Sequence, residues 1–523
     1  MIYKRLLCVG LSLLFLAACA SHDRKQALIL RLGAEPSMLN PILSVDGSSS
    51  SVNGYIFNGL LTVDEQMQLV PDLAKRYEFS DDGTVIRFYL HEHIRWHDGA
   101  AFTAHDVKFT YDLIADPHTQ TVRRSNYVID GMPVEFVVIN DYELEVRSPK
   151  AFAPLLNHLT MGILPKHIYE HEDVNRSKYN RQPIGTGPFT LRAWESAQYV
   201  LLNRNEDYFG KAPKLEKILL KIIPDNNTAL VSFEREEVYN CGIPAKEYER
   251  ISSNAAYQSF RYYDLNYTFM GFNLHHEFFK DLQVRQAISM AINKEAIVRG
   301  VLKGFAKEAH LPTSPTMWTY PSKPFSYEYN LEMAKQLLFD QGFRVDPTTG
   351  LLSRNGQAFS FKLITNKGNK DREKAAEIIQ SNLKALGISV SIQLMEWSSF
   401  VAILSAKEHP KAFDAVMLGW GLGLDPDIFS VWHSSQYPDG FNFVGYNNAS
   451  VDALLSKGRQ ELDPLKRKQI YATLYDTIAK ELPYVFLYYP ESLVGYSHFV
   501  KGLSAAGPSG LLNPIENISI LEQ

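Results

Sequence analysis

The chain has 523 residues, of which 45% are hydrophobic and 21% charged, and a formal net charge of -5. This length is more than one ordinary hydrophobic core supports, so it predicts two large lobes or about three domains and excludes a single small module. No cluster of Lys and Arg residues is dense enough to neutralise a phosphate backbone, which argues against nucleic acid as a partner.

The amino terminus has the pattern of an export signal over residues 1–18. Lys4 and Arg5 precede an apolar run over residues 6–16, which is shorter than the about 20 residues that a permanent membrane-spanning helix needs. Small residues, Ala17 and Ala18, close the segment as they do at cleavage sites. We therefore expect the mature protein to be exported.

The cleavage site is followed at once by a cysteine. The stretch Leu16-Ala17-Ala18-Cys19 resembles the bacterial lipobox, which implies that Cys19 becomes the lipidated first residue and that residues 19–27 form a tether on the extracytoplasmic side of a membrane. The alternative is ordinary signal cleavage beside an incidental cysteine. Only Cys241 then remains, so no internal disulfide is expected.

The first predicted elements beyond the tether lie near residues 84–115. Strict alternation of apolar and other residues predicts a half-buried strand over 84–90, and the capping-box spacing of Thr103 and Asp106 predicts a helix that starts at Thr103. The later elements expected are helices over 330–341, 371–386 and 464–482 and a strand over 388–394. Strand and turn patterns dominate residues 60–260 and helices follow residue 280, so we predict a boundary near residue 270.

Three histidines directly after the predicted strand could form a metal site. An exported zinc hydrolase would use His91, His93 and His97. If the strand continues past Leu90, these histidines and Arg95 share one face, and the like charge of Arg95 lies between two of the ligands. We therefore favour a solvated face of a scaffold.

A second histidine pair fits the H-x-x-E-H pattern of one zinc-peptidase class. His167 and His171 would share a helix face, but Pro165 makes this only the first turn of a short helix. The chain has no G-x-S-x-G elbow, no Walker loop and no dinucleotide fingerprint. We predict no catalytic residue, no metal and no cofactor, and keep the zinc hydrolase as the alternative from a different class.

A set of short motifs occurs in one order along nearly the whole mature chain. The motifs are Glu35-Pro36 with Leu39-Asn40-Pro41, Leu69-Val70-Pro71-Asp72, Trp96-His97-Asp98-Gly99, Gly185-Thr186-Gly187-Pro188, Phe272-Asn273-Leu274, Gly419-Trp420 and Asp425-Pro426-Asp427. Each is weak alone, but the ordered set resembles the family 5 bacterial extracellular solute-binding proteins, which include the oligopeptide- and dipeptide-binding proteins of ABC importers.

The resemblance implies an α/β fold, namely a two-lobe periplasmic-binding-protein fold of type II-like topology, enlarged by an extra β-rich subdomain. Lobe I would comprise residues 28–60, 185–271 and 488–523, the extra subdomain residues 61–184, and lobe II residues 272–487. The crossings near Phe272-Asn273 and Tyr488-Tyr489 would form a hinge. The implied function is capture of short peptides by a lipid-anchored monomer that delivers them to ABC permease and ATPase subunits.

The resemblance also directs attention to a ligand site between the lobes. We expect the ligand to lie between the 420–424 loop and the 35–39 segment, with these residues in contact or nearby: Glu35, Tyr267, Asn273, Trp420, Gly421, Leu422, Gly423 and Asp425. Trp420 offers a rigid surface, and the two glycines permit close approach of main-chain groups. The alternative is that Trp420 is simply core.

One departure from the family pattern bears on the ligand. Peptide-binding relatives hold the ligand ammonium with an aspartate a few residues after the Gly-Trp pair, whereas Trp420 is followed by Gly-Leu-Gly-Leu. A ligand ammonium would need Glu35, Asp46 or Asp425, or the ligand would be held through its backbone alone. A metal chelate, a sugar or an opine bound by the same fold is the runner-up.

Overall fold

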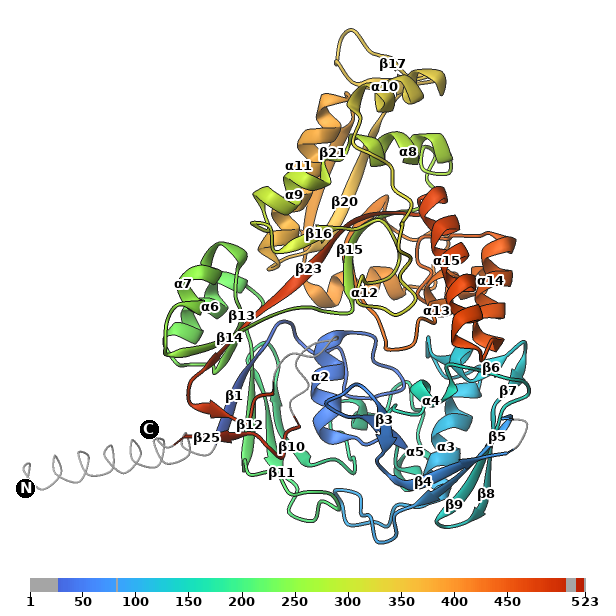
Figure 1. Cartoon of the computed structure of the whole chain (residues 1–523), viewed down its shortest axis with the longest axis vertical. Helices are drawn as coiled ribbons and strands as arrows, with labels where there is room; N and C mark the ends of the chain where they lie inside the picture. The colour runs from blue at the N-terminus through green and yellow to red at the C-terminus, as the bar shows by residue number, and fades with distance from the viewer. Residues whose placement is uncertain (1–26, 81–82, 505–513, 522–523) are drawn as a thin grey trace, which may run out of the picture.

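The computed structural model describes residues 27–80, 83–504 and 514–521. The leader, Cys19 and most of the tether lie outside this part of the chain. Figure 1 shows an elongated molecule in which two bodies are stacked along the long axis and are joined by long strands. We keep the names lobe I, extra subdomain and lobe II for its parts.

Lobe I is built on a four-stranded sheet in the order β1 (Ala27–Leu32), β12 (Lys217–Ile222), β11 (Tyr199–Arg204) and β10 (Phe189–Glu195). β1 runs parallel to β12, and the other pairs are antiparallel. Helix α2 (Gly47–Ile56) packs closely against the Gly-Thr-Gly-Pro motif. A Cβ at Gly187 would come within 2.5 Å of the Ile56 carbonyl carbon, so this approach requires glycine.

The extra subdomain has its own sheet, in the order β4 (Ala74–Phe79), β5 (Val85–Leu90), β9 (Glu143–Arg147) and β8 (Glu135–Asn140). The predicted strand is confirmed as β5, and the predicted helix as α3 (Ala104–Ala115). The capping box forms as expected, because the Thr103 N–H donates to Asp106 Oδ2 at 2.9 Å and Thr103 Oγ1 accepts from the first turn.

Lobe II contains most of an eight-stranded sheet. Its main path is β13 (Asn240–Gly242), β23 (Tyr484–Ser497), β15 (Asn266–Phe272), β22 (Ala415–Gly421), β20 (Ser360–Asn366) and β21 (Ser389–Met395), and β14 (Tyr257–Tyr263) and β16 (Ala306–Glu308) also pair with β23. β20 and β21 are parallel and are linked by α11 (Lys370–Ala385), which confirms the predicted α/β unit.

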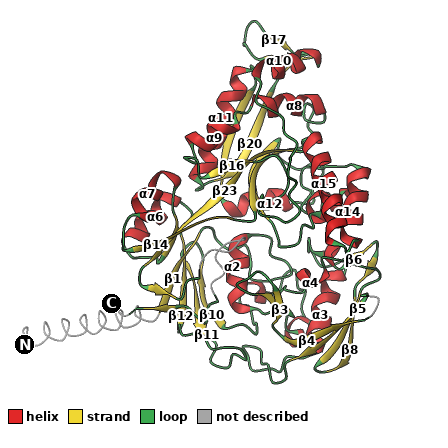
Figure 2. Cartoon of the chain, in the orientation of Figure 1, coloured by secondary structure: helices red, strands yellow, loops and turns green. Residues whose placement is uncertain are grey.

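The helices predicted farther along the chain are confirmed within one residue at each end. They are α10 (Leu331–Asp340) and α15 (Pro464–Glu481). Gly342 and Gly387 follow α10 and α11 with φ values of 85° and 82°, as helix-ending glycines do. Figure 2 shows that the helices concentrate in lobe II, whereas strands make up much of lobe I and the extra subdomain.

The remaining elements are shorter or peripheral. The other helices are α4 (Leu155–His158), α5 (Lys166–Tyr169), α6 (Asn226–Glu234), α7 (Tyr248–Ser252), α8 (Leu282–Ala291), α9 (Lys294–Gly300), α12 (Trp397–Ser405), α13 (Phe429–Trp432) and α14 (Ala449–Gln460). Short strand pairs are β2 (Leu61–Val63) with β3 (Leu69–Pro71), β6 (Val128–Ile129) with β7 (Met132–Pro133) and β24 (Val500–Lys501) with β25 (Ser519–Ile520). β17 (Arg344–Val345), β18 (Leu352–Arg354) and β19 (Gln357–Ala358) form a small three-stranded sheet.

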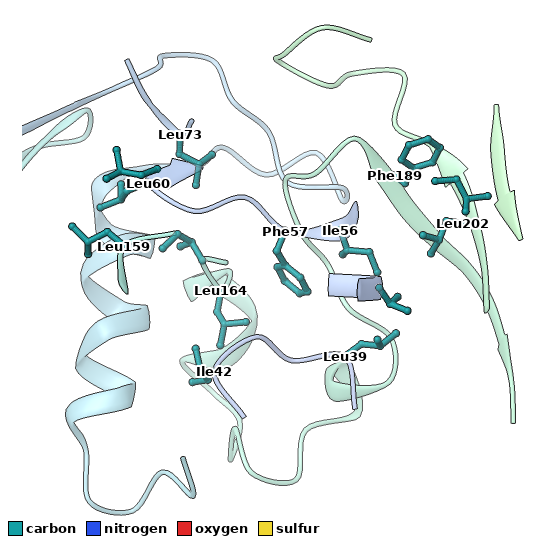
Figure 3. Close-up of a cluster of buried hydrophobic side chains, with 14 of the residues drawn as sticks. Leu39, Ile42, Ile56, Phe57, Leu60, Leu73, Leu159, Leu164, Phe189 and Leu202 are labelled. Carbon is teal, nitrogen blue, oxygen red and sulfur yellow. The ribbon is translucent and has the colours of Figure 1, made fainter. Parts of the chain in front are cut away.

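Buried side chains form separate cores in the two bodies. Lobe I and the extra subdomain share one core, in which residues from α2, the segment after α4 and β10 pack together (Figure 3). The other cores lie in lobe II. β23 passes between them, since Tyr488 belongs to a lobe II core and Leu493 to the lobe I core. A change in angle between the lobes would therefore disturb few core contacts.

Candidate functional site

The histidines after β5 have structural surroundings that the sequence did not reveal. The condition under which the histidines would share a strand face is not met, because β5 ends at Leu90 and a turn follows in which His93 has a φ of 68°. His97 is instead half-buried: the Gly185 N–H donates to its Nδ1 at 3.2 Å, and its Nε2 donates to the Gly187 carbonyl at 3.0 Å. Burial lowers the pKa of His97, which favours this neutral tautomer.

The H-x-x-E-H histidines are also held apart from any metal-like cluster. α5 is a single turn, His167 Nε2 lies 2.8 Å from Asp98 Oδ2, and His171 is exposed. Among residues 27–80, 83–504 and 514–521, no three His, Cys, Asp or Glu side chains are grouped so that they could hold a metal ion. His97 and His167 thus contact the Gly-Thr-Gly-Pro loop and Asp98, respectively.

Several of the expected site residues do come together, at one end of the β15–β22 pair. Tyr267 lies opposite Trp420 in the register, and Leu422 N–H donates to the Leu265 carbonyl at 2.6 Å. Trp420 is half-buried and packs on Phe443, with ring centroids 5.8 Å apart. Its ring is thus fixed by core contacts on one side and retains exposed surface on the other.

Two expected contacts have mainly structural partners. Tyr267 is 1% exposed, with its ring against Phe486 in the lobe II core. Asn273 lies past the opposite end of β15, where its amide donates to the carbonyls of Lys411 and Phe413 at 3.1 and 2.7 Å. Of the remaining members of the 420–424 loop, Trp420 and Leu422 are half-buried, and Gly421 and Gly423 are exposed.

The three carboxylates considered for a ligand ammonium are all engaged within the protein. Glu35 accepts hydrogen bonds from Trp194 Nε1, at 2.8 Å, and from the Ala197 N–H. Asp46 caps α2, accepting from the Ser49 N–H at 2.9 Å, and Asp425 forms a two-pronged ion pair with Arg467, both contacts at 2.6 Å. Of the options left by the sequence, this favours a ligand held through its backbone.

An apolar cavity of about 60 Å³ lies beside Trp420. Most of its lining belongs to lobe II, including Trp397, Phe441 and Phe443. Val45 and Val122 close it from the other body. Sequence reasoning missed these two valines, since nothing in their neighbourhood distinguishes them from ordinary core residues.

Arg372 is a second residue that sequence reasoning missed. It lies in the first turn of α11, where the helix dipole disfavours a cation, and this position was the available signal. Its guanidinium donates to Asn366, but its buried Nε has no partner in the described structure. A Cβ at Gly419 would lie 3.3 Å from its Nη2, and burial lowers the pKa of Arg372. A polar group with an unused donor therefore lies beside β22.

Arg459 connects lobe II to the other body. Its guanidinium pairs with Asp427 at 2.8 Å and donates to the Ser125 carbonyl at 2.6 Å and to Asn126 Oδ1 at 3.2 Å. Its own carbonyl accepts from the Ala153 N–H at 2.8 Å. The structure is thus one in which the lobes are in direct polar contact.

Two bodies joined by crossing strands, with a cavity and polar contacts between them, define a two-lobe ligand-binding protein. The model of the Bacterial extracellular solute-binding proteins, family 5 Middle, matches residues 68–442, and the chain belongs to this family. The predicted α/β periplasmic-binding-protein fold is confirmed by its likeness to solved members.

Three relatives illustrate the likeness. The chain is 33% identical to the oligopeptide-binding protein AppA of Bacillus subtilis (strain 168), over 93% of this chain and 94% of AppA. The structure of B. subtilis AppA in complex with a nonapeptide matches with a TM-score of 0.90 at 32% identity, and the match covers 95% of this chain and 99% of AppA. NikZ of Campylobacter jejuni with Ni(L-His) gives a TM-score of 0.85 at 29% identity, covering 95% and 99% of the two chains. DppA of Helicobacter pylori with the peptide STSA gives 0.85 at 25%, covering 96% and 100%.

These findings set the class of activity. The chain is an extracellular solute-binding protein of the ABC-importer type, a family of binding proteins rather than enzymes. In the described residues, every helix is too short or too polar to cross a membrane.

Proposed function

We propose that this protein captures short peptides between its lobes and delivers them to the permease and ATPase subunits of an ABC importer. The observation that carries the proposal is the apolar cavity beside Trp420, which both bodies line and which suits an apolar ligand side chain. The relatives AppA and H. pylori DppA, whose structures hold a nonapeptide and STSA, support a peptide as the ligand class.

The β22 strand offers a place for the ligand backbone. In the described chain, β22 pairs with β20 only at Ala415 and Val416, so its end from Leu418 to Gly421 carries no strand on that side. A ligand strand added there can exchange main-chain hydrogen bonds whatever its sequence. The Arg372 guanidinium also borders this end of β22, since its Nη2 lies beside Gly419.

The binding test compares Trp420→Ala and Gly423→Val with Trp420→Phe as the matched control. Calorimetric titration with STSA and with random nonapeptides is expected to show affinity about 30-fold lower in Trp420→Ala and preserved in Trp420→Phe. Thermal melts of the unliganded variants separate lost binding from lost folding. Unchanged affinity in both Trp420→Ala and Gly423→Val would remove this loop from the site.

The runner-up is a non-peptide solute, such as a metal chelate, a sugar or an opine. The relative NikZ, whose structure holds Ni(L-His), supports this alternative. Mass spectrometry of the ligand that copurifies with protein from native cells distinguishes the two. A nickel chelate in place of peptides would overturn the proposed ligand class.

The proposal includes attachment to a membrane through Cys19, on the evidence of the lipobox-like sequence. Cys19→Ser is expected to move the protein from the membrane fraction to the soluble fraction. Retention of the variant in the membrane fraction would contradict the lipid anchor without affecting the ligand proposal.

A further inference from the structure

A small cavity of about 10 Å³ is lined only by residues of lobe II and lies outside the interface between the bodies. It has room for a single small occupant, such as one water molecule or one monoatomic ion. Apolar side chains form part of its wall, and two nitrogen-bearing side chains form another part; these residues are Phe325, Ala479, Leu482, Phe486, Lys294 and His310. The nitrogen groups decide which occupant fits.

Lys294 is a buried cation without a counter-charge. It is the first residue of α9 and is 7% exposed. Its ammonium donates to the Ala309 carbonyl at 2.8 Å, and in the described part of the chain no Asp or Glu forms an ion pair with it. An ammonium has three N–H donors, so two are left for other partners. Burial lowers the pKa of Lys294 to about 8, as expected of a charge that the protein does not balance.

His310 supplies a further donor to the same cavity. Its Nδ1 is buried and has no hydrogen-bond partner among the described residues. Burial, together with the charge of Lys294, lowers the pKa of His310 to about 4, so the imidazole is neutral near pH 7. As the tautomer that carries its proton on Nδ1, the ring donates without adding charge. A buried donor left unpaired destabilises the folded state, so an acceptor in the cavity would stabilise both groups.

Two carboxylates act on Lys294 from the surface. Burial lowers the pKa of Lys294 more than Glu308 and Glu328 raise it, and both of these side chains are exposed. Glu328 Oε1 also accepts from Ser326 Oγ at 2.7 Å. Water and salt screen charges on exposed side chains, so neither carboxylate replaces a counter-ion beside the buried ammonium.

We propose that this cavity binds one halide ion, normally chloride, which accepts from the Lys294 ammonium and from the Nδ1–H of neutral His310. A monoatomic anion can reach both donors within the small volume, whereas sulfate and phosphate are too large for it. The apolar part of the wall also favours a singly charged ion, because removing water from a multiply charged anion costs more. The site is independent of the proposed function, since it takes no group of the captured ligand.

The cavity adjoins β23, the long strand that crosses between the lobes. Phe486 in its wall belongs to β23. β16 pairs with β23, and the Ala309 carbonyl that accepts from Lys294 follows directly after β16. The His310 N–H donates to Tyr489 Oη of β23 at 3.3 Å. A bound halide is therefore expected to stabilise the lobe II end of this strand.

The first test compares thermal unfolding of the unliganded protein in sodium chloride, sodium bromide and sodium gluconate at equal ionic strength. Gluconate is too large for the cavity. We therefore expect the wild-type Tm to be about 2 °C higher in chloride or bromide than in gluconate, each at about 0.1 M. Equal wild-type Tm values in the three salts would overturn the proposal.

Three variants locate the effect. Lys294→Met keeps a long side chain but removes the charge, and it is expected to unfold at the same temperature in all three salts. The matched control Lys323→Met, at an exposed lysine, is expected to keep the halide effect. His310→Phe removes the second donor and is expected to raise the chloride concentration for half of the effect about tenfold. A halide effect of wild-type size in Lys294→Met would be a general salt effect and would overturn the site.

Diffraction from wild-type crystals grown in sodium bromide tests the position without any substitution, so it decides the question even if a variant fails to fold. Bromide scatters anomalously, and we expect one anomalous peak between Lys294 Nζ and His310 Nδ1. Density in the cavity without an anomalous signal identifies a water molecule and overturns the proposal.

Discussion

The two aspartates of the Asp-Pro-Asp motif pair with two arginines that connect different parts of the molecule. Asp425 pairs with Arg467 of α15, which also donates to the Gly458 carbonyl at 2.9 Å, so this cluster stays within lobe II. Asp427 pairs with Arg459 of α14, and Arg459 continues to the Ser125 carbonyl and Asn126 in the extra subdomain. One pair consolidates a lobe, and the other joins two bodies.

The aromatic rings near the two arginines differ in the same way: those near Arg459 come from both bodies, and the ring near Arg467 comes from its own helix. Arg459 lies over the Phe429 ring of lobe II, 3.8 Å from its centroid, and 5.3 Å from the Phe152 centroid of the extra subdomain. Arg467 contacts Tyr471, its neighbour on α15, at 5.5 Å. A short motif can thus supply both the internal order of a lobe and a contact that depends on the angle between the lobes.

The largest expected effect comes from removing either carboxylate. Asp425→Asn and Asp427→Asn each leave a buried guanidinium without its counter-charge, which is expected to lower the free energy of unfolding by about 3–5 kcal/mol. Urea unfolding of the unliganded proteins measures it. A loss below about 1 kcal/mol, the range of exposed pairs, would show that the pair is not buried in solution.

The next prediction separates the two pairs. Arg459→Met removes both hydrogen bonds to the extra subdomain, so we expect a larger radius of gyration by small-angle scattering and weaker binding of STSA. Arg467→Met is the matched control, because it also leaves a buried aspartate unpaired but breaks no contact between the bodies. Charge-assisted hydrogen bonds contribute about 1.5–3 kcal/mol each, so at least a tenfold loss of the closed form is expected.

Scattering from the two variants and from ligand-saturated protein tests hinge closure as well. Equal radii of gyration for Arg459→Met and Arg467→Met would contradict a role of Arg459 in holding the lobes together. No decrease of the radius on saturation with peptide would contradict closure on binding.

The sequence predicted the elements whose signals are local. The α3 capping box and the glycine after α11 are set by residues within one turn of each other, so local spacing located the start of α3 and the end of α11. The turn after β5 was missed because His93 adopts a positive φ, which only glycine and a few polar residues commonly signal. His97 was missed as a support of the Gly-Thr-Gly-Pro loop because its partners lie about ninety positions away.

The site followed the same rule. Trp420 was singled out by the Gly-Trp motif of the family resemblance, and the structure places it near the end of β22. The engagement of Asp425 by Arg467 was not, because α15 reaches this carboxylate only through tertiary packing. Val45 and Val122, which line the cavity beside Trp420, come from the other body and carry no local sequence mark of that position.

A smaller effect is expected from acid. Burial by itself raises the pKa of Asp427, but the Arg459 guanidinium and His158 outweigh it and hold the pKa well below its ordinary value. A depressed carboxylate contributes stability that is present above its unfolded-state pKa, about 3.9, and is lost as pH falls towards the folded-state pKa. Urea unfolding between about pH 5 and 3 should show this slope. The slope should flatten in Asp427→Asn, and an unchanged slope would assign it to other carboxylates.

The smallest changes test whether closure depends on Arg459 itself or on the general stability of lobe II. Asn448 caps α14, which carries Arg459, and Asp463 caps α15, which carries Arg467. Asn448→Ala and Asp463→Ala each remove a side chain that accepts from two main-chain N–H groups, so each is expected to lower the free energy of unfolding by about 1 kcal/mol. Neither touches the contacts of Arg459 with the extra subdomain, so both variants should keep the wild-type radius of gyration and peptide affinity. If Asn448→Ala increases the radius of gyration as Arg459→Met does, closure of the lobes depends on the stability of α14. The Asp427–Arg459 pair would then have no specific role in holding the lobes together.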